Sequence, residues 1–244
     1  MGQLIIPALV LRRSDYSDYD RMVTLFSPDM GRVDAIARGC RRPKSPLVNA
    51  VEPFTSGEYQ LFERQGRFSI EQCQISENYY ALRTDYDKLC HGAYWLRLLD
   101  AAVLPDTPAR ELFVMTLRAL AHLNWGEMPP EMVTMAFEMH FMALNGLQPR
   151  MDACIRCGRP INGDARFDAD QGGAVCLECP TNAPDISNGA RRILMKLPRT
   201  AFDKFTLLDG HADWPEAARH FRSYVNLKMH MQKFAPPLLS EQQA

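Results

Sequence analysis

Four cysteines are the residues of this chain whose type and spacing point most clearly to chemistry. Cys154 and Cys157 form one C-x2-C pair, and Cys176 and Cys179 form a second pair after a spacer of 18 residues. Two pairs at this spacing are typical of a zinc ribbon, because both sulfurs of each pair can reach one tetrahedral ion. Four thiolates leave no open coordination position, so we expect one structural Zn2+ ion per chain.

The alternative to a metal site is a redox dithiol. A single C-x-x-C pair can serve that role, but two pairs without a surrounding βαβ pattern favour metal. Between the pairs lies one short strand-like run, Ala165 to Asp168, which is enough for a β-hairpin that brings them together. Three other cysteines, Cys40, Cys73 and Cys90, lie singly in the first half of the chain and are predicted to be buried thiols in a reducing compartment.

A second pattern is a basic segment that holds four cations in seven residues without an acid: Arg38, Arg41, Arg42 and Lys44. Gly39 and Pro43 predict a loop that carries no core side chain, so its cations are free to reach phosphates. The other interpretation is a solvated charged loop. Residues 1–78 contain ten Lys plus Arg and ten Asp plus Glu, so a nucleic-acid-binding surface here must be polarised.

The basic segment lies within a predicted β domain. Five short runs rich in β-branched and aromatic residues are separated by turn signals: Leu4 to Leu11, Met22 to Phe26, Val33 to Ala37, Gly57 to Phe62, and Phe68 to Ile75. Five strands without a long intervening helix suit a small closed sheet. An OB-like barrel is favoured, although an SH3-like barrel fits the periodicity almost as well.

Helical periodicity begins near residue 78. It predicts helices around Tyr86 to Leu96, Leu112 to Ala119 and Met132 to Met142, the last one ending at a left-handed cap on Gly146. The third helix carries a methionine stripe that is interpreted as flexible core filler. Two more helices are predicted after the cysteines, over Ala190 to Leu197 and Asp213 to Met231.

The last of these helices begins with a capping-box pattern, Asp213 followed by Glu216. The predicted organisation is therefore α+β, with an OB-fold-like DNA-binding barrel over 1–78 and a helical domain over 79–148 and 183–234. The four-cysteine zinc element over 149–182 is embedded in the helical domain, and a loose tail follows over 235–244.

Composition and missing motifs restrict the function. The chain has 244 residues and a formal net charge of −1, and it contains neither a membrane-spanning apolar run nor a signal-peptide pattern, so we expect a cytoplasmic protein. It has no phosphate loop, nucleophile elbow or H-E-x-x-H motif, and the closely spaced Asp15, Asp18 and Asp20 are predicted to form a turn instead of a magnesium site. Catalysis is not expected.

Three segments carry a resemblance to a known family: Asp20 to Ser27, Gly31 to Ser45, and Glu52 to Phe54. Their order, with Gly31-Arg32-Val33 followed by Ala37-Arg38-Gly39, is similar to the N-terminal domain of the RecO family of recombination mediators. The helical middle and the cysteine pairs also follow the order of that family, so the resemblance covers nearly the whole chain.

The resemblance implies a non-enzymatic DNA repair protein that contains an OB-fold, a helical domain and a zinc element. RecO proteins bind single- and double-stranded DNA, anneal complementary strands, and act with RecR to load RecA onto DNA coated by single-strand-binding protein. A place in the cytoplasm at the nucleoid would follow. The residues that match are the four cysteines, as zinc ligands, and the basic segment, as DNA contacts; Arg12 and Arg21 of neighbouring strands are predicted to extend the basic patch.

Two other functions remain open at this stage. The chain could be a protein-interaction scaffold with a structural zinc ion, in which the basic segment is only solvated. It could also be a zinc-ribbon regulator that binds nucleic acid. Strong salt dependence of binding to oligonucleotides of unrelated sequence would favour the mediator over the scaffold, whereas sequence preference would favour the regulator.

Overall fold

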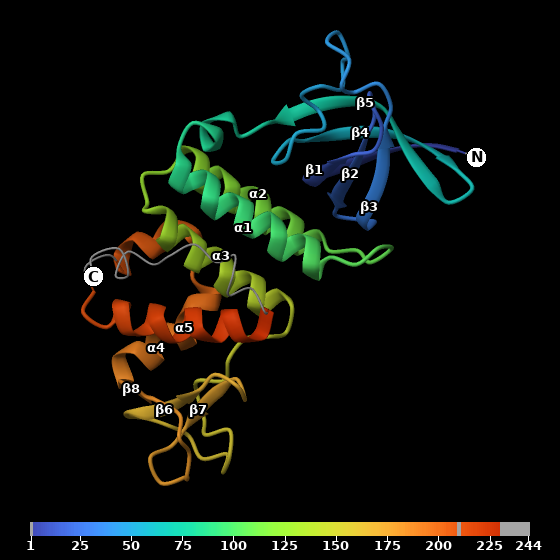
Figure 1. The fold of residues 1–244 in the computed structure, drawn as a ribbon. Coiled ribbons are helices and arrows are strands. Elements are labelled where there is room, and N and C mark those ends of the chain that lie inside the picture. Colours follow the sequence, from blue (N-terminus) through green and yellow to red (C-terminus); the bar gives the residue numbers. More distant parts are fainter. Residues whose placement is uncertain (1, 209–210, 230–244) are drawn as a thin grey trace. The chain divides into compact units, whose positions relative to one another are not determined.

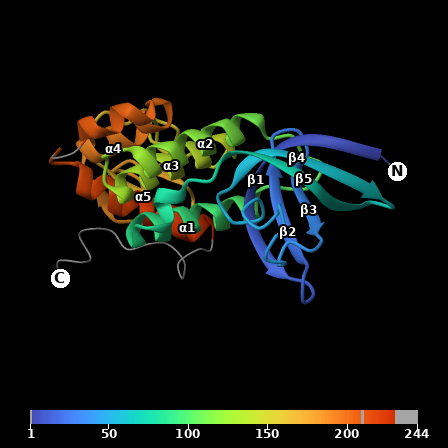
Figure 2. The ribbon, with the colours of Figure 1, turned by 90° about the horizontal axis from the view of Figure 1, so that it is seen from above.

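The computed structural model describes residues 2–208 and 211–229. The chain divides into two compact units, Met1–Trp125 and Gly126–Ala244 (Figure 1). Strands followed by helices make up the first unit (Figure 2). Helices with a small sheet make up the second unit (Figure 1). The α+β class is thereby confirmed. The division after Trp125 lies inside the predicted segment 79–148, and the domain limits stay a prediction.

Five strands close into a barrel in the first unit: β1 (Gly2–Asp15), β2 (Arg21–Ser27), β3 (Gly31–Ala37), β4 (Ser56–Arg64) and β5 (Arg67–Glu77). Their order around the barrel is β1-β2-β3-β5-β4. Neighbouring strands are antiparallel except β3 and β5, which pair in parallel. This is the strand order of an OB-fold, so the OB-like prediction is confirmed over the SH3-like alternative.

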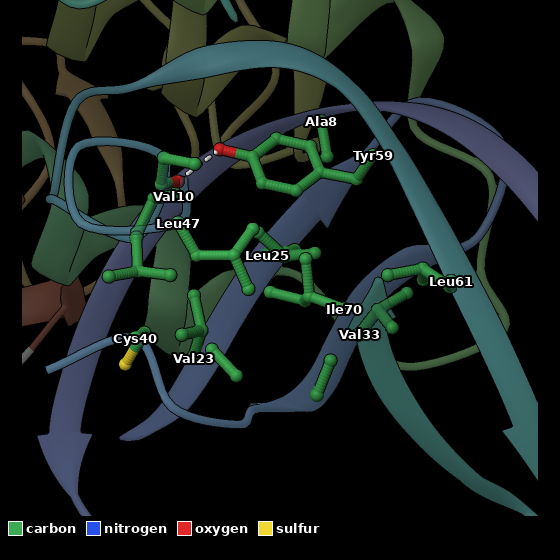
Figure 3. Close-up of a cluster of buried hydrophobic side chains, with 14 of the residues drawn as sticks. Ala8, Val10, Val23, Leu25, Val33, Cys40, Leu47, Tyr59, Leu61 and Ile70 are labelled. Carbon is green, nitrogen blue, oxygen red and sulfur yellow. Dashed lines mark hydrogen bonds between the residues drawn. The ribbon is translucent and has the colours of Figure 1, made fainter. Parts of the chain in front are cut away.

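The barrel core follows from the period-2 pattern of its strands. Val23, Leu25 and Val33 point inward with Tyr59 and Leu61 (Figure 3). The Tyr59 hydroxyl donates a hydrogen bond of 2.7 Å to the carbonyl of Ala50, which lies in the segment between β3 and β4. Burial therefore does not leave this phenol without a partner.

The segment between β3 and β4 closes one end of the barrel. Its buried side chains belong to the barrel core: Cys40, Leu47, Ala50 and Val51. The expectation that the basic segment carries no core side chain is therefore wrong, because Cys40 is only 1% exposed. Cys73 and Cys90 are half-buried and do not meet the prediction of buried thiols, which holds for Cys40.

Two helices and a short 3-10 helix complete the first unit: η1 (Tyr80–Arg83), α1 (Tyr86–Ala102) and α2 (Arg110–Trp125). The Asp85 side chain caps α1 by accepting hydrogen bonds from the backbone N–H groups of Asp87 and Lys88. The barrel and helix α2 meet at Phe26 and Phe113, whose rings pack edge to face with centroids 5.3 Å apart.

The second unit begins with α3 (Pro130–Leu144), which is followed by Gly146 in the predicted left-handed conformation, with φ of 69°. The methionine stripe of α3 is buried, which confirms its interpretation as core: Met132, Met135, Met139 and Met142. The remaining helices are α4 (Asn188–Lys196), η2 (Leu197–Arg199), η3 (Phe202–Leu208) and α5 (Trp214–Met229). The predicted end of the last helix at Met231 and the tail over 235–244 lie outside the described residues.

The predicted capping box of α5 has a different partner. Glu216 accepts hydrogen bonds from the backbone N–H and the hydroxyl of Ser187, which is the N-cap of α4. The Glu216 carboxylate thus joins the starts of two helices, a pairing that local spacing cannot reveal.

The cysteine segment folds as a small sheet of three strands, β6 (Ala165–Asp168), β7 (Gly173–Val175) and β8 (Asp185–Ile186), in the order β7-β6-β8. The hairpin of β6 and β7 confirms the hairpin predicted between the cysteine pairs. Strand β8 was not predicted. Among the described residues, no helix combines the length and the apolar character that a membrane span requires.

Candidate metal centre and nucleic-acid interface

The four predicted zinc ligands converge at one point. The sulfur atoms of Cys154, Cys157, Cys176 and Cys179 all lie within 4.8 Å of one another. The sulfur atoms of Cys157 and Cys176 are 3.8 Å apart. Zinc–sulfur bonds of about 2.3 Å in a tetrahedral site place neighbouring sulfur atoms about 3.8 Å apart, so this distance fits such a site. No other group of three or more His, Cys, Asp or Glu ligands gathers within the described ranges.

Backbone hydrogen bonds shape the first cysteine pair. The N–H of Gly158 donates to the carbonyl of Cys154 at 2.9 Å, and the N–H of Cys154 donates to the carbonyl of Arg159. This tight turn requires φ of 75° at Gly158, a conformation that glycine adopts without strain. The N–H of Ile155 donates to the carbonyl of Ala174 in β7 and fixes the turn to the hairpin. The first knuckle is therefore held by backbone contacts.

Arg159 stabilises the anionic form of one ligand. Its Nε atom donates to the sulfur of Cys157 at 3.5 Å, and its Nη1 atom lies 2.6 Å from Oε2 of Glu178. The hydrogen bond from Arg159 to the Cys157 sulfur is the main cause that lowers the pKa of Cys157. Thiolates are the form that binds zinc, so the residues present fit a closed four-cysteine site that would be structural.

The surface charge of the cysteine segment is not that of a DNA-binding module. Residues 149–182 contain four arginines and five carboxylates, and four thiolates around Zn2+ would add two further negative charges. Each arginine is paired with a carboxylate: Arg150 with Asp152, Arg156 with Asp168, Arg159 with Glu178, and Arg166 with Asp185. This charge distribution disfavours the zinc-ribbon regulator.

The basic segment of the barrel is docked against the turn between β1 and β2. Oδ1 of Asp20 accepts a hydrogen bond of 2.8 Å from the N–H of Gly39, and this bond is the main cause that lowers the pKa of Asp20. The N–H of Arg41 donates to the carbonyl of Tyr19, and the guanidinium of Arg42 lies 5.1 Å from the Tyr19 ring centroid. The segment is thus a shaped surface rather than a free loop.

All four cations of the basic segment are exposed: Arg38, Arg41, Arg42 and Lys44. Nη1 of Arg41 lies 3.3 Å from Oδ2 of Asp15 and donates to the Ser17 carbonyl. Asp15 and Asp20 therefore hold the basic segment in place. Asp15 ends β1, and Asp18 and Asp20 lie in the connection to β2, where a turn was predicted.

A groove of about 840 Å³ lies on the outer face of β2 and β3, between the β1–β2 turn and the β4–β5 turn. Its lining combines cations with partly exposed aromatic rings: Arg38, Arg64, Arg67, Tyr16, Phe62 and Phe68. Asp34 and Glu71 also line the groove, and Asp34 is paired with Arg32 at 3.3 Å. In OB-folds this face and these two loops are where oligonucleotides bind.

Arg64 and Arg67 were missed by the sequence analysis. They flank Gln65 and Gly66, whose φ angles of 51° and 72° make the two-residue turn of the β4–β5 hairpin. The sequence Arg-Gln-Gly-Arg between two strand-like runs is the signal that could have identified them, because a tight hairpin turn must present its flanking residues at the end of the barrel.

The two predicted strand cations are already engaged. Arg12 pairs with Asp100 at 3.0 Å, and Arg21 contacts both Asp15 at 3.3 Å and Glu52 at 3.1 Å. Neither lines the groove. They stay predicted DNA contacts, although their guanidinium groups would have to exchange a carboxylate for a phosphate.

Comparison with known proteins covers nearly the whole chain. The family model "Recombination protein O N terminal" matches residues 1–79, and "Recombination protein O C terminal" matches residues 83–232. The chain is 36% identical to "DNA repair protein RecO" of Anaeromyxobacter sp. (strain K) over 204 residues, 81% of this chain and 80% of that protein. It is 31% identical to the protein of that name from Desulfitobacterium hafniense (strain Y51) over 215 residues, 85% of this chain and 78% of the relative.

Proposed function

Because the chain belongs to the RecO family of DNA repair proteins, we propose that it is a non-enzymatic, DNA-binding mediator of recombinational repair. In this proposal it binds single- and double-stranded DNA, anneals complementary strands, and acts with RecR to load RecA onto DNA coated by single-strand-binding protein. Its place is the cytoplasm, at the nucleoid.

The groove on the barrel is the observation that carries the DNA-binding proposal. Arg64 and Arg67 lie at one end of the groove, and Arg38 joins it to the basic segment. A phosphodiester backbone can follow these cations while its bases stack on exposed rings such as Tyr16, which is 63% exposed. This combination of a basic track with aromatic platforms binds single strands with little regard to sequence, because every base has a π-face.

The proposal of a non-enzymatic role rests on chemistry. A metal centre closed by four thiolates has no coordination position open for water or substrate. Asp15 is paired with Arg41 and Arg21, and Asp20 accepts from the N–H of Gly39, so two of the three closely spaced aspartates are already engaged. The sequence offers no phosphate loop. DNA binding and the annealing of complementary strands require neither an open metal site nor a carboxylate cluster nor a phosphate loop.

The decisive experiment separates a DNA-binding barrel from an interaction scaffold with solvated cations. Each phosphate contact on a single strand contributes about −0.7 to the slope of log affinity against log salt concentration. Changing Arg41 and Arg42 to Ala should therefore weaken binding to oligonucleotides of unrelated sequence to a similar extent. The salt slope should become flatter by about one to one and a half units.

A matched control is the double variant Arg192→Ala and Arg219→Ala, which removes two exposed arginines from helices α4 and α5. It should leave the affinity and the salt slope unchanged. If the Arg41 and Arg42 variant is folded and binds DNA like the parent protein, the basic segment is only solvated. Annealing of complementary oligonucleotides, with and without bound single-strand-binding protein, then tests the mediator role; no acceleration in either condition would contradict it.

A further inference from the structure

Three arginines converge on a single carboxylate at the barrel end. Oε2 of Glu52 accepts a hydrogen bond of 3.1 Å from Nε of Arg13. The Glu52 carboxylate also lies 3.1 Å from Nη1 of Arg21 and 3.7 Å from Nη1 of Arg83. These arginines come from β1, β2 and η1, which are distant in sequence. Their side chains are 31%, 17% and 29% exposed, so water and solutes reach the cluster. We call these four residues the Glu52 cluster.

The Glu52 cluster and the groove lie on opposite sides of the sheet: Arg13 and Arg21 point to its inner side, and the groove lies on its outer face. Arg21 is opposite Ala37 in the β2–β3 ladder, and Arg13 is opposite Val23 in the β1–β2 ladder. Ala37 and Val23 are core residues, and side chains that face each other across a ladder point to the same side of the sheet. Met22, the next residue along β2, lines the groove on the outer face.

The cluster carries excess positive charge. Arg21 also contacts Asp15, and Asp15 contacts Arg41 of the basic segment, so four guanidinium groups share two carboxylates. Like charges held this closely repel one another, and the repulsion is relieved when another anion enters. Both oxygens of the Glu52 carboxylate accept hydrogen bonds from guanidinium groups. The carboxylate thereby takes the position that a phosphate group occupies in arginine-rich sites.

We propose that the Glu52 cluster is a second DNA-binding site, which binds the phosphodiester backbone of a second strand while Glu52 holds its arginines in place when DNA is absent. The inference rests on the proposed DNA-binding function and deepens it. A strand is favoured over a free anion because Asp15 and Arg41 connect the cluster to the basic segment, so that consecutive phosphates meet consecutive cations.

The two sites would hold their strands differently. The groove offers rings that stack on bases, whereas the Glu52 cluster consists of guanidinium groups that contact only the backbone. A strand bound through its phosphates keeps its bases free to pair. One barrel would thereby present a second strand to the strand in the groove, which is the arrangement that annealing requires.

The test is the isosteric change Glu52→Gln, which keeps the shape of the side chain and removes its charge. The full chain is titrated with a short fluorescent oligothymidylate, and both binding events are followed at several salt concentrations. We expect two oligonucleotides per chain, with the second event at least threefold tighter in the variant. Its salt slope should be steeper by about 0.7, because one more counterion is released. The first event should be unchanged.

Glu58→Gln is the matched control, since it removes one negative charge from an exposed position on β4. It should not strengthen the second event selectively. Arg13→Ala provides the opposite change and should weaken the second event alone, and circular dichroism checks that each variant is folded. A single binding event in all variants, or equal effects of the Glu52 and Glu58 changes, would overturn the second site while leaving the groove intact. Absence of any binding would overturn the proposed function as well.

Discussion

The barrel and the zinc element are both small β structures, yet they are held together in different ways. Strands of 7 to 14 residues form the barrel, which encloses a continuous apolar core. The zinc element has strands of 4, 3 and 2 residues, too short to enclose a core of that kind. Metal bonds to its four cysteines would replace the missing apolar contacts. The difference indicates that a metal bound by these cysteines would serve architecture.

The same two regions also differ in charge. The barrel presents exposed arginines at its groove and on its basic segment, whereas every arginine of the zinc element is paired with a carboxylate. Under the proposed function, polyanions such as DNA should be attracted to the first region and not to the second. The metal site and the proposed DNA interface are therefore separate features, and they can be perturbed separately.

The largest expected effect comes from the metal. Replacing Cys154 with Ser should lower zinc content well below one equivalent and unfold the segment around β6 and β7, because zinc binding contributes on the order of 10 kcal/mol to such sites. Hydrogen exchange should show lost protection there and unchanged protection in β1 to β5. The parent protein, purified without chelators, should contain one zinc per chain; less than half an equivalent would contradict the assignment.

A smaller effect is expected from the barrel core. Leu25 is fully buried, and its change to Ala should destabilise the barrel by about 3 kcal/mol through lost contacts and a residual cavity. Ile5→Ala is the control, because Ile5 is 68% exposed on β1 and should cost less than about 0.5 kcal/mol. Denaturant unfolding measures both variants. Adding a chelator should not change the cost of Leu25→Ala; if it does, the two regions are not held independently.

Sequence alone predicted those features that depend on local periodicity or spacing. The five barrel strands, the helix ending at Gly146 and the cysteine pairs belong to this group. Features that depend on side chains meeting across long separations were missed. Asp20 binds the N–H of Gly39 nineteen residues away, and Glu216 binds Ser187 twenty-nine residues away. A pattern of a few neighbouring residues therefore could not predict that the basic segment is docked or that two helix starts share one carboxylate.

Burial was also only partly predictable. Cys40 lies in a polar, arginine-rich stretch and yet enters the core, because it is one of the four side chains that the segment closing the barrel end turns inward. Arg64 and Arg67 were overlooked for another reason: they lie between two strand-like runs, far in sequence from Arg38, and only the closed barrel brings them beside it. Closure of the sheet, which no local pattern encodes, creates the groove.

The smallest expected effect is a difference between the two regions in how their stability depends on pH. Burial is the main cause that lowers the pKa of His220, which packs against Phe167 of the zinc element; Glu216 opposes this shift and Arg219 supports it. The unfolded chain takes up a proton on this histidine near pH 6.5, whereas the folded chain does so only at lower pH. Stability of the second unit should therefore be complete above pH 6.5 and should decrease as the pH falls below it.

The barrel should respond only in stronger acid. Asp20 has a lowered pKa because Gly39 and Ser17 donate to its carboxylate, so the stability that these bonds contribute is present above about pH 4 and is lost below it. Between pH 7.5 and 6, protection from hydrogen exchange should thus weaken around Phe167 and α5 but not in β1 to β5, with zinc content checked at each pH. His220→Gln should remove this dependence and Asp20→Asn should not. A dependence that survives in the His220 variant would assign it to the thiolates instead.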